Sequence, residues 1–169
     1  RQRESTIKKE EKDPRVTDAS ELMHLPERYF ENWHKIRQLA RQQFADLLKE
    51  DPENEKRLSQ PQAFMDFVTA LVRGRGAELA IGNMDLNLLA RFLHLDLLGL
   101  GALQLILDIP GLEDAFLIRW DTLDVVINGT KHRVYPTGFN SDEEVRYFLE
   151  SRVFGPINKA LTRENPSEN

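Results

Sequence analysis

The chain has 169 residues, which is enough for one compact domain or two small ones. Its net charge of -5 argues against a nucleic-acid-binding surface, because phosphate binding needs a basic patch, and residues 74–130 hold three basic side chains against eight acidic ones. The absence of cysteine excludes disulfides and thiolate metal sites and fits an intracellular protein, and no apolar run is long enough to span a membrane.

The first stretch, residues 1–22, mixes both charge signs and holds almost no large apolar side chains. Such a segment cannot bury enough apolar surface to offset the entropy cost of ordering, so we predict a flexible tail. The chain begins with Arg1 and shows no signal-peptide pattern, and we expect it to be a piece of a longer protein.

Residues 23–108 are predicted to form a helical bundle of three helices with short connections. The first helix follows Pro26 and carries apolar residues at spacings of three and four, which puts them on one face: Trp33, Ile36, Ala40, Phe44 and Leu47. A capping-box pattern of Ser59 and Gln62 predicts the start of the second helix, which Gly74 and Gly76 end. The third helix, within residues 83–98, is apolar almost all the way round and should be central.

Residues 109–158 are predicted to form a small α/β domain, which makes the fold class α+β. After Pro110-Gly111 we expect a strand over 114–120 and a hairpin over 123–135, whose turn is Asn128-Gly129 because Asn-Gly readily adopts the positive φ angles of a type I′ turn. A helix should follow, with Ser141 as its cap and Glu144 completing a capping box, and should end or kink at Gly155-Pro156. Residues 159–169 are polar and are expected to begin a linker to a motor domain absent from this chain.

The sequence contains no pattern typical of a catalytic or metal-binding site. There is no phosphate-binding P-loop pattern, and the Gly-x-Gly of residues 74–76 follows a predicted helix rather than a strand, which favours a helix end over a phosphate site. The four histidines share no metal-ligand spacing, and Glu113 and Asp114 should point to opposite faces of a strand. We therefore assign no catalytic residue, no metal ligand and no cofactor to this chain.

The segment "DLLGLGALQLILDIPGLEDAFLI" resembles the N-terminal region of the type II and type IV secretion ATPases, and most closely the CpaF/TadA-like motors of tight-adherence pili. The family pattern is a Leu-Gly-x-Gly helix, a proline, an acidic pair, a strand, a hairpin and a capped helix. The matching positions are Leu98, Gly99, Gly101, Leu103, Leu107, Pro110, Glu113 and Asp114. The similarity covers roughly residues 60–169.

This resemblance implies an assembly and regulatory domain in the N-terminal part of a hexameric secretion or pilus-assembly ATPase. The domain would be cytoplasmic and peripheral to the inner membrane, would dock inner-membrane platform proteins rather than nucleic acid, and would move relative to a RecA-like motor. The parent protein would use ATP and Mg, whereas this chain lacks the motifs to hydrolyse ATP alone. By the same resemblance, Lys159 and Arg163 are the candidates for a nucleotide contact in the full-length protein.

Two alternatives stay open. The chain could be a stand-alone protein-interaction or regulatory module without a motor, or a sensor that holds a small ligand between its sheet and a helix. The sequence alone does not identify the secretion, pilus or conjugation system that is served. For the isolated chain we expect a monomer or a weak dimer.

Overall fold

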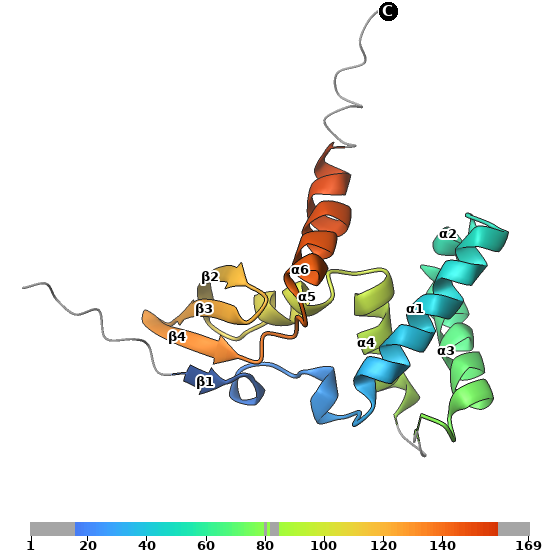
Figure 1. Cartoon of the computed structure of the whole chain (residues 1–169), viewed down its shortest axis with the longest axis horizontal. Helices are drawn as coiled ribbons and strands as arrows, with labels where there is room; N and C mark the ends of the chain where they lie inside the picture. The colour runs from blue at the N-terminus through green and yellow to red at the C-terminus, as the bar shows by residue number, and fades with distance from the viewer. Residues whose placement is uncertain (1–15, 80, 82–84, 159–169) are drawn as a thin grey trace, which may run out of the picture.

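The computed structural model describes residues 16–79, 81 and 85–158 and shows an α+β fold (Figure 1). A helical region is followed by three strands and a C-terminal helix, and a short strand that precedes the helical region completes a four-stranded mixed sheet. The helical region contains α1 (Trp33–Glu50), α2 (Asn54–Leu58), α3 (Pro61–Arg75), α4 (Leu86–Leu97) and α5 (Ala102–Leu107). The sheet contains β1 (Val16–Asp18), β2 (Leu112–Arg119), β3 (Thr122–Ile127) and β4 (Thr130–Tyr135), and α6 (Asp142–Phe148) follows it.

The core of the helical region, here called the bundle cluster, is built from the inner faces of α1, α3 and α4. The predicted spacing on α1 is confirmed, since Trp33, Ile36, Ala40 and Phe44 are all buried. Helix α4 packs against both α1 and α3, as its apolar composition indicated. The other main members of the bundle cluster are Phe30, Phe64, Phe67, Val68, Leu71, Leu89, Phe92, Leu93 and Leu97.

The start of α3 differs from the prediction. Ser59 is not its cap: that residue ends the short helix α2, and α3 begins at Pro61 with Gln60 as its N-cap. The reason is that proline fits the first helical position, where its missing N–H costs nothing and its fixed φ suits a helix. The end of α3 agrees with the prediction, because Gly76 is its C-cap.

The sheet has the strand order β1-β4-β3-β2, with β1 parallel to β4 and the other pairs antiparallel. The predicted turn is confirmed, as Asn128 and Gly129 have φ angles of 47° and 78°. One sheet face packs against α5 and α6 and forms the second core, here called the sheet cluster. Its buried members are Ala19, Met23, Leu25, Ile106, Ile109, Leu123, Val125, Val134, Phe139 and Phe148.

Residues 16–22 correct the predicted tail of residues 1–22. Val16–Asp18 form β1 on the free edge of β4, where pairing depends on the backbone rather than on apolar side chains. Ala19 is completely buried in the sheet cluster, and the Asp18 carboxylate accepts a hydrogen bond from the Ser20 amide that caps the following turn. The remaining part of that prediction, residues 1–15, lies outside the described residues.

The C-terminal helix also differs at one point. The predicted cap is confirmed, since Ser141 Oγ accepts from the Glu144 amide. Of the two outcomes predicted for Gly155-Pro156, an end or a kink, the end is wrong, because the helix continues past this pair. It passes through a π-helical turn at Leu149–Phe154 and remains helical to residue 158. A π-turn shifts the hydrogen-bonding pattern by one residue, which accommodates a proline that has no N–H to donate. Figure 1 shows the far end of this helix projecting from the other elements, whereas Phe148 nearer its start is buried in the sheet cluster.

Over the described part of the chain, no helix is both long and apolar enough to cross a bilayer.

Candidate docking groove and ion-pair latch

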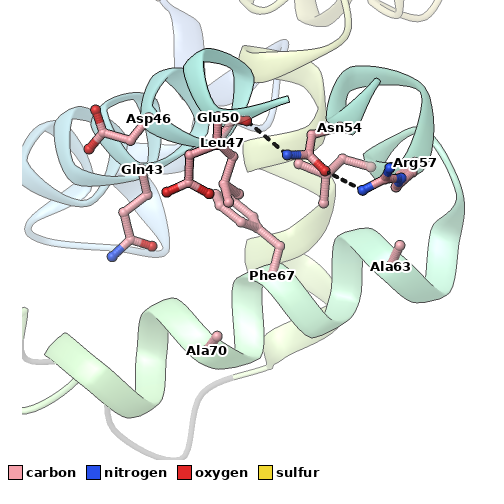
Figure 2. A pocket seen from close by; sticks show the side chains of 10 residues that line it. Gln43, Asp46, Leu47, Glu50, Asn54, Arg57, Ala63, Phe67 and Ala70 are labelled. Carbon is pink, nitrogen blue, oxygen red and sulfur yellow. Dashed lines mark hydrogen bonds between the residues drawn. The ribbon is translucent and has the colours of Figure 1, made fainter. Parts of the chain in front are cut away.

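A hollow of the helical region lies between the C-terminal half of α1, the short helix α2 and α3 (Figure 2). This groove has a volume of about 580 Å³, within the range of roughly 300–1,000 Å³ that is usual for binding sites. Its lining residues are Gln43, Asp46, Leu47, Glu50, Asn54, Arg57, Leu58, Ala63, Phe67 and Ala70. The α3 residues that line the groove are Ala63, Phe67 and Ala70, at the spacing i, i+4 and i+7. One face of α3 therefore forms the floor of the groove.

Side chains of different character line the floor and the rim. Leu47 and Phe67 meet at the floor, and the small Ala63 and Ala70 flank the phenyl ring and leave room for an incoming backbone. The short helix α2 is fixed to α1 by Asn54, whose Nδ2 donates to the Leu47 carbonyl oxygen at 2.8 Å. The groove is therefore open and apolar at its base, which suits the apolar face of a helix.

The rim of the groove carries an excess of negative charge. Asp46 and Glu50 both face solvent. Asp46 lies 4.0 Å from Lys49, whereas Glu50 has no ion-pair partner within the part of the chain that the structure describes. The charge of Arg57 is neutralised by Asp51 at 2.8 Å, and the same guanidinium also donates to Asn54. An incoming segment with Lys or Arg beside its apolar side chains would therefore match both the floor and the rim.

A second constellation, here called the latch, joins the helical region to the C-terminal helix. It consists of Arg37 and Arg41 on α1, Asp96 on α4 and Glu144 on α6. Arg41 binds the Asp96 carboxylate through two bonds of 2.7 Å, and Arg37 Nη1 donates to Glu144 Oε1 at 2.8 Å. Because Arg37, Asp96 and Glu144 are nearly excluded from solvent, each charge depends on the others for compensation.

The electrostatics of the latch follow from this arrangement. Partial burial tends to lower the pKa of Arg41, but the hydrogen bonds and charges of Asp96 and Glu144 outweigh burial and hold that pKa above its ordinary value. Glu144 also accepts from the Asn140 amide at 2.8 Å with its other oxygen. One carboxylate thus fixes the start of α6 and its position on α1.

Sequence reasoning missed the latch. The signal that was available is the placement of Arg37 and Arg41 four residues apart, beside Ile36 and Ala40 on the buried face of α1. Asp96, inside an otherwise apolar helix, is the matching anomaly, because a buried carboxylate almost always has a partner. The pairing itself joins residues 55 and 107 positions apart, which no local pattern encodes.

The remaining sequence candidates are placed as follows. Lys159 and Arg163, proposed for a nucleotide contact, lie outside the described residues. Among described residues, His24 pairs with Tyr29, His94 packs against Phe64, and His132 pairs with Thr17. No group of three or more His, Cys, Asp or Glu able to hold a metal occurs over the described ranges.

No family model, no curated protein and no solved structure matches this chain.

Proposed function

We propose that this chain is the N-terminal assembly and regulatory domain of a hexameric secretion or pilus-assembly ATPase of the CpaF/TadA-like type. The proposal rests on the resemblance of the segment around Gly99 and Gly101, supported by the order of elements that follows it: α5, the acidic pair, the hairpin and the capped helix α6. The domain would work at the cytoplasmic side of the inner membrane and bind platform proteins there. ATP and Mg would be bound by the full-length parent, with Lys159 and Arg163 near the nucleotide.

The latch is the single observation that carries the mechanical part of the proposal. A regulatory domain must convey its position to the motor, and in this chain the helix leading to residue 158 is fixed to the bundle by Arg37–Glu144. Docking of a partner on α1 and displacement of the C-terminal helix are thus coupled through one ion network. The groove is the place at which we expect the partner to dock, since it is lined by the same helix α1.

The first test is the coding sequence downstream of Asn169 and the activity of the protein that it encodes. A P-loop after a predicted strand, and Mg-dependent ATP hydrolysis by the longer protein, are the expected results. In that protein, Glu144→Gln should change the stimulation of ATP hydrolysis by a partner more than the basal rate. An unrelated downstream domain would refute the proposal.

The groove favours a second candidate, a protein-interaction module that works without a motor. Here Ala70→Glu tests the docking role, because Ala70 is exposed in the groove and a carboxylate there would block an apolar partner. Gln38→Glu is the matched control, as it adds the same charge at an exposed α1 position outside the groove. Partner binding that survives Ala70→Glu would exclude the groove under either function.

A further inference from the structure

The edge strand β2 has an open backbone. In the order β1-β4-β3-β2 it is the outermost strand on its side, and its outer N–H and C=O groups have no strand partner in the described chain. It spans Leu112–Arg119, whereas the opposite edge is formed by the three residues of β1. A long open edge is a template for pairing with another chain unless something covers it.

The side chains of β2 also favour pairing with another chain. Phe116 lies opposite Asp124 of β3, on the sheet face that points away from the buried Leu123 and Val125. Phe116 is 53% exposed and Ile118 is 64% exposed, which are large values for such apolar residues. Asp124 beside Phe116 is covered by Arg133 at 2.8 Å and by Lys131 at 3.6 Å, whereas Asp114, two residues before Phe116 on the same face, is exposed.

The strand is also complementary to itself in charge. In an antiparallel pair of two β2 strands with Phe116 opposite Phe116, residues at equal distances from Phe116 face each other. Glu113 of each copy then lies opposite Arg119 of the other copy, which gives two pairs of opposite charge. Shifting the centre by one residue either way, to Ala115 or Leu117, loses this match and places Arg119 opposite Gly111 or Ala115. Cross-strand pairs of opposite charge stabilise a sheet, and like charges destabilise it.

Two features limit the strength of such pairing. Register irregularities at Leu112/Asp114 and Leu117/Arg119 leave only 114–117 in regular pairing with β3. Arg119 also binds Asp121 of its own chain at 3.0 Å, while Glu113 has no ion-pair partner within the described part of the chain. The contact should therefore be weak and reversible, formed at high local concentration.

We propose that β2 pairs with β2 of a second copy around a twofold axis at Phe116, so that the two sheets join into one. Such an interface is isologous, because the same strand serves on both sides. This pairing is independent of the proposed function and needs no motor domain.

The test is sedimentation velocity of the whole chain over a wide range of concentrations, with circular dichroism to verify folding of each variant. The unaltered chain should show a monomer–dimer equilibrium. Glu113→Arg and Arg119→Glu should each weaken dimerisation roughly tenfold, because each replaces two attractions by two repulsions, and the double variant should restore it. Phe116→Glu, which places two like charges at the axis, should abolish the dimer.

The control is Glu31→Arg, which makes the same charge change at an exposed residue of the helical region. It should leave the dimer unchanged. A chain that stays monomeric at millimolar concentration overturns the proposal, and so does a dimer that ignores Phe116→Glu. If the single variants weaken the dimer and the double variant does not restore it, the register that places Glu113 opposite Arg119 is wrong.

Discussion

Replacing Glu144 by Gln tests whether the latch holds the two cores together. The substitution keeps the size of the side chain and an oxygen for the Asn140 amide, but removes the charge 2.8 Å from the buried Arg37. Breaking a buried ion pair by removing one partner costs about 3–5 kcal/mol. Asp96 remains 3.9 Å from Arg37 and partly compensates its charge. We therefore expect the free energy of unfolding to fall by about 3 kcal/mol, the lower end of this range.

The two tryptophans allow the cores to be followed separately in urea. Trp33 is buried in the bundle cluster, and Trp120 packs against the sheet cluster. Single-tryptophan proteins made with Trp33→Phe or Trp120→Phe should unfold with coincident curves. With Glu144→Gln the midpoint should fall by about 1–2 M urea, and the two curves should separate.

The matched control is Glu143→Gln, which removes a neighbouring charge that is exposed on α6. It should change the midpoint little. If Glu144→Gln behaves like this control, with an unchanged midpoint and coincident curves, the latch does not connect the cores and the mechanical reasoning fails.

Three further outcomes follow from single residues. Gly101→Ala should lower stability by about 3 kcal/mol in urea unfolding, because Gly101 has a φ of 54° and an added Cβ would lie 2.6 Å from the Phe148 ring. The hydrogen bond and charge of Arg133 hold the pKa of Asp124 below its ordinary value, so this pair stabilises the fold above the unfolded pKa, and its contribution is lost as the pH falls through the folded pKa. Urea midpoints measured from pH 7 down to pH 2 should accordingly fall less steeply for Asp124→Asn than for the unaltered chain. Ser141→Ala should cost about 1 kcal/mol in thermal unfolding through the lost helix cap, and no loss would mean that Glu144 alone orders this helix start.

The sequence predicted those parts of the fold that local chemistry decides. The spacing of Trp33 and Phe44, the Asn128-Gly129 turn and the Ser141 cap each depend on residues close together in the chain, and all three are confirmed. The order of the helical region before β2, β3 and β4 followed from the change in apolar period after Pro110.

Features that depend on distant partners were not predicted. Val16–Asp18 became a strand only because β4 offers a free edge, and their own composition gave no sign of it. The groove likewise arises from the packing of α2 between α1 and α3, and the sequence did not predict a separate helix over 54–58. Tertiary packing decides such cases, since local propensity is only a weak prior.

The position of β1 determines the order in which the two cores can be completed during translation. Val16 pairs with Arg133, so β1 has to wait for β4 to leave the ribosome. At ordinary elongation rates this wait lasts on the order of ten seconds. The bundle cluster, whose members lie between Phe30 and Leu97, is available long before that. We expect the nascent chain to carry a finished helical half and an open sheet edge, to which β1 is added only after β4 has been made.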